Sequence, residues 1–205
     1  MERPILFNTD MVRAILEGRK TQTRRIIKPQ PKEQLKCVIQ HEVSGYAHWV
    51  EASQYGQPYP KNIEYFKSIE VGDTLWVRET WADLRGLGFD KPFTYLADCL
   101  NKNGVEDADG KRCRLDYGVK WKPSIHMPRA AARIFLKVTN VRVERLQDIT
   151  HHGVISEGIA GDINANCKQG DRITPRNEFI NLWDSIYNNW KENPWVWVIE
   201  FERMV

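Results

Sequence analysis

The 205-residue chain has only four cysteines, and no two of them form a Cys-x-x-Cys pair. Closely spaced cysteine pairs are the usual sign of a zinc or redox site, so neither is predicted. No apolar run approaches the roughly 18 residues of a membrane span, and the N-terminal residues lack the apolar core of a signal peptide. We therefore expect a cytoplasmic protein with reduced thiols, no membrane association, no metal ion and no cofactor.

Acidic side chains are absent between residues 19 and 28, although the net charge of the whole chain is only +3. Nucleic-acid binding without sequence preference depends on local clustering of cations rather than on net charge. The cluster therefore predicts that Arg19, Arg24 and Lys28 contact a single-stranded nucleic acid, with RNA favoured over DNA. A solvated basic turn is the alternative interpretation.

Hydrophobic spacing predicts a mixture of helices and strands. Helices are expected after the N-caps Thr9, Thr150 and Thr174, and the first two are expected to end at Gly18 and Gly158. Strands are expected at 74–81, 133–146 and 195–201. Proline-rich and glycine-rich stretches at about 28–68 and 83–122 are interpreted as long loop insertions. The pattern indicates an α+β fold around a small barrel, with residues 1–205 forming a single domain.

A dense polar segment follows Gly18, where the first helix is expected to end. Lys20, Thr21, Thr23 and Arg25 lie within seven residues of that glycine. A lysine and hydroxyl groups held just beyond a rigid helix end can act on a polar substrate, because catalytic groups are commonly placed on short anchored loops. This segment is therefore the leading candidate for the functional site.

Four segments in this order resemble the ASCH domain family: GRKTQTRR at 18–25, VGDTLWVRE at 71–79, LQDITHHGVISEGI at 146–159 and VWVIEF at 196–201. The segments PSIHMPR at 123–129 and VRETWA at 77–82 are similar to those of longer ASCH-type proteins encoded by bacteriophages and prophages. The resemblance implies an RNA-associated protein of a bacterial host. It also implies a PUA-like fold, a small mixed β-barrel with flanking helices, carrying two long loop insertions.

The small bacterial ASCH proteins that this chain resembles are amidohydrolases that remove the acetyl group from N4-acetylcytidine. Their catalytic lysine and threonine lie in a G-R-K-T-x-T-x-R motif, which matches Lys20 and Thr23, and its arginine matches Arg25. Their catalytic glutamate lies eleven residues after a leading leucine, which corresponds here to Leu146 and Glu157. The resemblance thus implies a catalytic set of Lys20, Thr23 and Glu157.

Hydrolysis of an N-acyl bond needs an activated nucleophile, stabilisation of the oxyanion and a proton for the leaving amine. Lys20 with a lowered pKa would take the proton of the Thr23 hydroxyl, and Glu157 would activate water or transfer the proton. Thr23 is either the covalent nucleophile or a ligand of the acyl oxygen beside an attacking water. No metal ion is required.

Further candidates for substrate contacts accompany this set. His126 and Arg129, in a proline-restricted segment, are candidates for binding a phosphate or a base edge, with a structural role as the alternative for His126. Trp76 is a candidate for stacking on a pyrimidine, and Glu79 for lining the pocket, with burial in the barrel as the alternative. Together with two residues of the polar segment, the expected substrate-binding residues are Thr21, Arg25, Trp76, Glu79, His126 and Arg129.

The function predicted from the sequence is a metal-independent amidohydrolase that acts on an N4-acylated cytidine or a related modified base. A non-catalytic module that binds RNA or modified DNA is the main alternative, since a fold by itself does not decide function. A ribonuclease is a further alternative, and a role in phage morphogenesis has the least support. The oligomeric state and the acyl group are left open.

Overall fold

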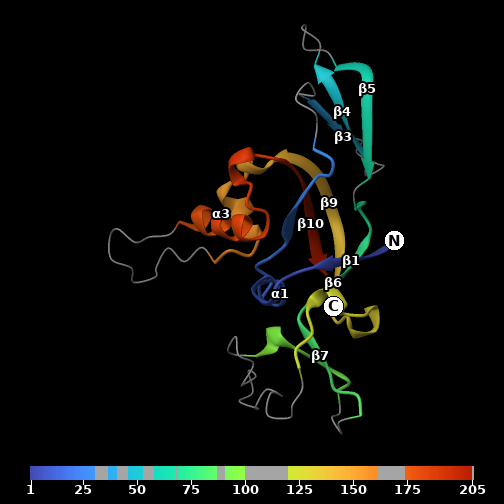
Figure 1. Cartoon of the computed structure of the whole chain (residues 1–205), viewed down its shortest axis with the longest axis vertical. Coiled ribbons are helices and arrows are strands. Elements are labelled where there is room, and N and C mark those ends of the chain that lie inside the picture. Colours follow the sequence, from blue (N-terminus) through green and yellow to red (C-terminus); the bar gives the residue numbers. More distant parts are fainter. Residues whose placement is uncertain are drawn as a thin grey trace. The chain divides into compact units, whose positions relative to one another are not determined.

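The computed structural model describes residues 1–30, 69–86, 91–99, 120–160 and 174–204 in full, and the backbone of the strands at 37–40, 46–52 and 58–67. Its helices are α1 (Thr9–Leu16), α2 (His151–Ser156) and α3 (Pro175–Ile186). Its strands are β1 (Glu2–Leu6), β2 (Gln22–Ile26), β3 (Cys37–Gln40), β4 (Tyr46–Ala52), β5 (Pro58–Lys67), β6 (Thr74–Arg78), β7 (Trp81–Asp83), β8 (Phe93–Tyr95), β9 (Phe135–Arg145) and β10 (Trp195–Arg203) (Figure 1). The prediction of an α+β fold is confirmed.

The largest sheet has the strand order β1-β6-β9-β10-β2. Strand β1 is parallel to β6, whereas β6–β9 and β10–β2 are antiparallel pairs. Among the described strands, no pairing joins the outer strands β1 and β2 to close this sheet. The strands β3-β4-β5 form a separate antiparallel sheet, and β7 pairs with β8. The chain divides into two compact units, of which residues 1–18, 74–137 and 203–205 form the first.

The first unit contains α1, β1 and β6. Helix α1 begins after Asn8, whose Oδ1 accepts a hydrogen bond of 2.8 Å from the Met11 amide. The predicted cap at Thr9 is therefore wrong by one residue, because an asparagine caps as well as a threonine and here precedes it.

Cys99 takes part in a disulfide bond, so the prediction that all the thiols are reduced is also wrong.

The second unit, residues 19–73 and 138–202, contains β2, α2 and α3. Its apolar core joins both helices to strand β10 and to the turn before α2, through Leu146, Ile149, Val154, Phe179, Trp183, Val196 and Val198. The predicted N-caps Thr150 and Thr174 are confirmed, because their hydroxyls accept hydrogen bonds from Gly153 and Asn177. Ile26 of β2 packs against this core, which places α2 beside that strand.

The two insertions contain strands that the sequence interpretation missed. Strands β3, β4 and β5 lie within residues 28–68, and β8 lies within 83–122. Pro58 and Pro60 suggested a loop, yet both belong to β5 at the edge of its sheet. An edge strand tolerates proline because one side of its backbone needs no ladder partner. Helices long and apolar enough to cross a membrane are absent from the part of the chain that the structure describes.

Candidate functional site

The predicted catalytic lysine and glutamate meet in the second unit. Gly18 and Gly158 have φ angles of 75° and 89°, a left-handed conformation that ends a helix and that glycine adopts without strain. Lys20 and Glu157, each next to one of these turns, then pair as an isolated antiparallel bridge. Two segments 137 residues apart are thereby fixed side by side.

The Lys20 ammonium group is saturated with acceptors. Its Nζ donates to Glu157 Oε2 at 2.9 Å, to the Glu157 carbonyl oxygen at 2.8 Å and to the Gln22 carbonyl oxygen at 2.9 Å. The side chain of Lys20 is 0% exposed and that of Glu157 is 5% exposed. Burial lowers the pKa of Lys20, and the neighbouring Glu157 carboxylate opposes that shift. A buried, perturbed ion pair of this kind is typical of functional sites and also of structural networks.

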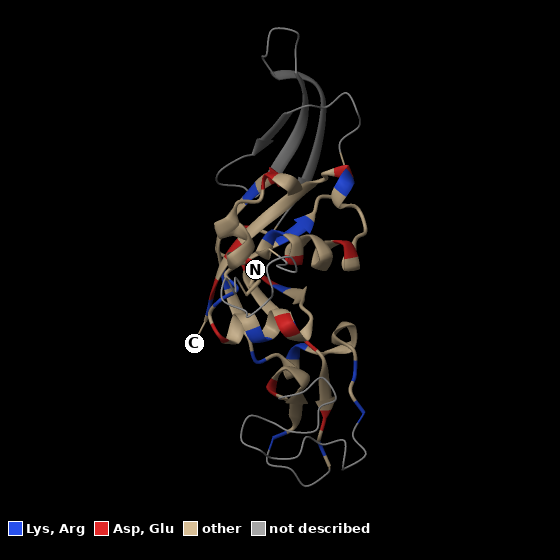
Figure 2. Ribbon diagram, turned by 90° about the vertical axis from the view of Figure 1, so that its left-hand side faces the viewer, with Lys and Arg blue, Asp and Glu red and all other residues tan. Residues whose placement is uncertain are grey.

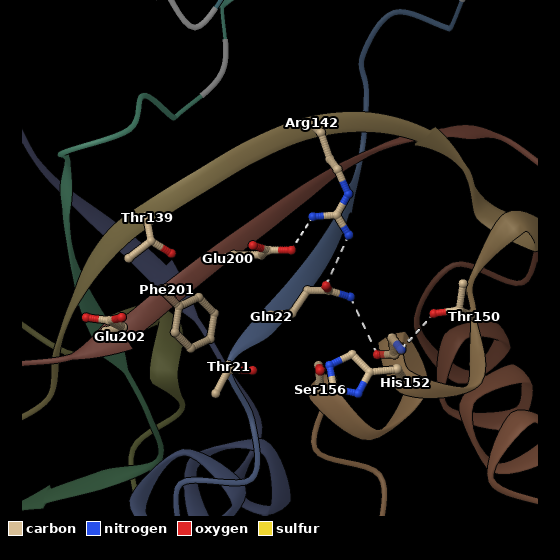
Figure 3. Close-up of a pocket in the computed structure, with 11 residues that line it drawn as sticks. Thr21, Gln22, Thr139, Arg142, Thr150, His152, Ser156, Glu200, Phe201 and Glu202 are labelled. Carbon is tan, nitrogen blue, oxygen red and sulfur yellow. Dashed lines mark hydrogen bonds and ion pairs between the residues drawn. The ribbon is translucent and has the colours of Figure 1, made fainter. Parts of the chain in front are cut away.

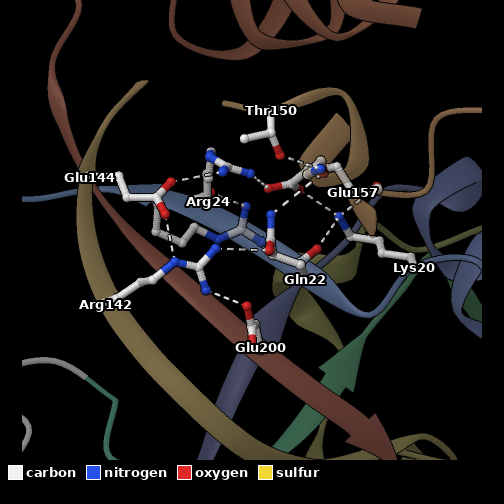
Figure 4. A network of polar contacts seen from close by, with 10 residues as sticks. Lys20, Gln22, Arg24, Arg142, Glu144, Thr150, Glu157 and Glu200 are labelled. Atoms are coloured by element: carbon white, nitrogen blue, oxygen red, sulfur yellow. Dashed lines mark hydrogen bonds and ion pairs between the residues drawn. The ribbon is translucent and has the colours of Figure 1, made fainter. Parts of the chain in front are cut away.

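The pair is the buried end of a larger network of alternating charges, whose members Arg142, Glu144 and Glu200 are partly exposed (Figure 4). Arg24 donates to Glu157 Oε1 at 3.1 Å and to Glu144 Oε2 at 3.0 Å. Arg142 donates to Glu144 Oε1 at 2.5 Å and also to Glu200. The cations Lys20, Arg24 and Arg142 thus face the carboxylates Glu144, Glu157 and Glu200.

Strand alternation explains how one face of the sheet collects these groups. Gln22 lies directly opposite Glu200, and Arg24 lies opposite Val198, which belongs to the core beneath α2 and α3. Side chains at alternate positions share a face, so Gln22 and Arg24 both point toward α2. Gly153 permits the close approach of α2, because a Cβ there would lie 3.3 Å from Arg24 Nη2.

A cavity of about 340 Å³ opens beside the network (Figure 3). It is lined by residues of β2, β9, α2 and β10 and by their flanking positions: Thr21, Gln22, Thr139, Arg142, Thr150, His152, Gly153, Ser156, Glu200, Phe201 and Glu202. The volume lies at the small end of the roughly 300–1,000 Å³ that ligand sites occupy. The lining is rich in hydroxyl, amide and charged groups beside the rings of Phe201 and His152, which suits a small polar heterocycle.

The structure does not bring Thr23 to Lys20 and Glu157. Thr23 lies between Gln22 and Arg24 on β2, so its side chain points to the opposite face. Its Oγ1 is buried and makes no hydrogen bond to any described residue. Lys20 and Glu157 do not line the cavity either, and Gln22 lies between them and the cavity.

The expected substrate-binding residues are divided between the two units. Thr21 lines the cavity, whereas Arg25 lies on the same face of β2 as Thr23. Trp76, Glu79, His126 and Arg129 belong to the first unit and take no part in this network.

Each of these four residues has a different setting in the first unit. Glu79 is buried and holds Arg133 through bonds of 2.9 and 3.0 Å, and burial raises the pKa of Glu79. Arg129 pairs with Glu2 at the surface. His126 is exposed, and Trp76 is half-buried. Glu79 is therefore committed to an internal ion pair rather than to a pocket.

The basic cluster at 19–28 is not one surface. Arg24 is 3% exposed and is paired with two carboxylates, so the prediction that it contacts nucleic acid is wrong. Arg19 and Lys28 are exposed, and Arg19 donates to the Gly158 carbonyl oxygen at 2.7 Å. In Figure 2 basic and acidic residues are interspersed along the described ribbon.

Sequence reasoning missed Gln22, Arg142, Glu144 and Glu200. A signal was present, because polar residues alternate at positions 142 and 144 of a strand whose other residues include Val141 and Val143. Polar residues at alternate positions of an internal strand indicate a shared polar face. Within QTR, residues 22–24, the same alternation places the side chain of Thr23 on the face opposite to those of Gln22 and Arg24.

In comparisons with known proteins, no family model, no curated protein and no solved structure matches the chain. The resemblance to ASCH proteins accordingly stays a prediction. The described residues contain no group of three or more His, Cys, Asp or Glu side chains arranged to hold a metal ion.

Replacing Thr23 by valine is expected to raise the free energy of unfolding by about 1 kcal/mol, because it removes a buried hydroxyl that lacks a partner. Urea denaturation measures the change. Thr23→Ser, which keeps the hydroxyl and loses a methyl group, is the control and is expected to destabilise by about 0.8 kcal/mol. A clear loss of stability in Thr23→Val would show that the hydroxyl has a partner.

Proposed function

We propose that the protein is a hydrolase that removes an acyl group from N4-acylated cytidine or a related modified base, on a PUA-like fold and without a metal ion. The observation that carries the proposal is the buried Lys20–Glu157 pair, hydrogen-bonded to the backbone of Gln22 beside a cavity of about 340 Å³. A cavity of that size accommodates a nucleobase. The nearby charges supply the groups that amide hydrolysis needs.

In the proposed reaction, a water molecule in the cavity attacks the acyl carbon, and its proton passes through a second water molecule to the Glu157 carboxylate, which does not itself line the cavity. The positive charge of Lys20, behind Gln22, stabilises the oxyanion through the electric field rather than by direct contact. The bond between the acyl carbon and N4 then breaks, and N4 receives the proton, so that the products are a carboxylic acid and cytidine. Thr23 has no step in this scheme, because its hydroxyl lies on the other face of β2.

A non-catalytic nucleoside-binding module is the second candidate. It is favoured by the complete saturation of the Lys20 ammonium group and by the absence of Lys20 and Glu157 from the cavity lining. Under this interpretation the pair serves only to hold α2 on strand β2.

The charges around the cavity favour a nucleoside over a polymer as the ligand. Among the described residues, Glu200 and Glu202 line the cavity together with a single arginine, Arg142, and that arginine is already bound to carboxylates. A phosphate group would meet unfavourable charge there. A ribonuclease or a reader of RNA or modified DNA therefore has less support than a nucleoside enzyme.

Release of cytidine from N4-acetylcytidine is the direct test. We expect turnover that a chelator leaves unchanged, measured by chromatography with and without EDTA. Loss of activity in EDTA and recovery with zinc would contradict the metal-free mechanism. Saturable binding of the nucleoside without turnover would support the binding module, and neither binding nor turnover would reject both candidates.

A further inference from the structure

The side chain of Gln22 has a fixed orientation at the wall of the cavity (Figure 3). Its Oε1 accepts from Arg142 Nη2 at 3.3 Å, and its Nε2 donates to the Gly153 carbonyl oxygen at 3.5 Å. A guanidinium group can only donate and a carbonyl oxygen can only accept. These two partners therefore fix which end of the amide is the oxygen and which is the nitrogen, two groups that are similar in shape.

The amide has capacity left for a ligand. A glutamine side chain carries two N–H donors and an oxygen with two lone pairs. Among the described residues Gln22 uses one of each, and both bonds are at the long end of the hydrogen-bond range. Gln22 is only 4% exposed, so the remaining donor and acceptor have little access to bulk water. A buried donor or acceptor without a partner costs free energy, so hydrogen bonds from this amide to a ligand in the cavity would be favourable.

We propose that Gln22 is the residue that recognises the base, by pairing its amide with an adjacent N–H donor and ring-nitrogen acceptor. The N4–H and N3 of a cytosine ring form such an edge, and N4 keeps one hydrogen when it is acylated. The choice of cytosine rests on the proposed function, whereas the requirement for a donor beside an acceptor follows from the amide itself.

The backbone of Gln22 connects this recognition to the ion pair. Its carbonyl oxygen accepts the 2.9 Å bond from Lys20 Nζ, while its side chain lines the cavity. A base paired with the amide is therefore held next to the residue that Lys20 contacts, with the exocyclic nitrogen at the paired edge. Gln22 is in this way a specificity-determining residue.

The test compares cytidine with 3-deazacytidine, in which a C–H group replaces N3, by calorimetric titration. Wild-type protein is expected to bind cytidine about ten- to a hundredfold more tightly, because the analogue leaves a buried N–H without an acceptor. Gln22→Met, which keeps the side-chain length, is expected to bind the two ligands equally. A merely structural role would weaken both ligands and leave their ratio unchanged.

Gln147→Met is the matched control. Gln147 donates to the Trp190 carbonyl oxygen at 2.9 Å and does not line the cavity, so the ligand ratio should equal that of wild type. Gln22→Asn, whose amide is set back by one methylene, is also expected to lose the preference for cytidine over 3-deazacytidine. It takes the place of Gln22→Met if Gln22→Met does not fold.

The outcomes separate this inference from the proposed hydrolase. A Gln22 variant that still prefers cytidine, or a wild type that binds both ligands equally or neither, overturns the role of Gln22 even if N4-acetylcytidine is hydrolysed. If the preference for cytidine depends on Gln22 but N4-acetylcytidine is not hydrolysed, the role of Gln22 is supported and the proposed hydrolase is rejected.

Discussion

Replacing Glu157 by leucine is expected to lower the free energy of unfolding by about 3–5 kcal/mol, the usual cost of removing one partner from a buried ion pair. The side chain of Lys20 is 0% exposed and would lose its counter-ion, and Arg24 would lose one of its carboxylates. Chemical denaturation measures the change, and the effect is among the largest that a single substitution produces.

The double variant Lys20→Met with Glu157→Leu is the control for this experiment. It removes both charges, so it is expected to recover most of the lost stability, as replacement of a buried pair by apolar residues commonly does. A single Glu157→Leu variant that loses less than about 1 kcal/mol would show that the pair behaves as a surface ion pair, for which that is the usual range.

Glu157→Gln is expected to reduce kcat for N4-acetylcytidine by about a hundred- to ten-thousandfold, the range for loss of a general acid or base. The amide has the shape of the carboxylate but does not accept a proton. Assays at a temperature where the variant is folded, confirmed by near-UV circular dichroism, separate this effect from the loss of stability.

Thr23→Val should keep turnover close to that of wild type, because the Thr23 hydroxyl lies on the other face of β2. This comparison tests whether the Thr23 hydroxyl takes part in the reaction at all. If Thr23→Val loses as much turnover as Glu157→Gln, the hydroxyl acts as the nucleophile or as a ligand of the acyl oxygen, and the scheme without Thr23 fails.

The sequence was most informative where the determinants are local. Thr150 and Thr174 each precede a helix whose first turn they cap, and Gly18 and Gly158 end helices through left-handed turns. These features depend on residues within one turn of each other, which is why their pattern is readable. The meeting of Lys20 and Glu157 was implied by motif spacing in a resembling family rather than by local physics.

The sequence was misleading where partners are distant. Arg24 looked like a surface cation because its carboxylates, Glu144 and Glu157, lie 120 and 133 positions away. Burial of an arginine depends on such partners, and no local pattern reports them. The face of Thr23 was predictable in principle, because a strand through Gln22 and Arg24 must send the residue between them the other way.

The balance of three cations against three carboxylates restricts how this site can evolve. A substitution at position 20 or 24 removes a counter-ion from the buried Glu157 carboxylate, and a substitution at 157 removes one from each of these two buried cations. Residues that share one network have strongly non-additive effects. Homologous chains should therefore change these positions in compensating pairs, so that covariation between 20 and 157 or between 24 and 144 would mark the same buried face.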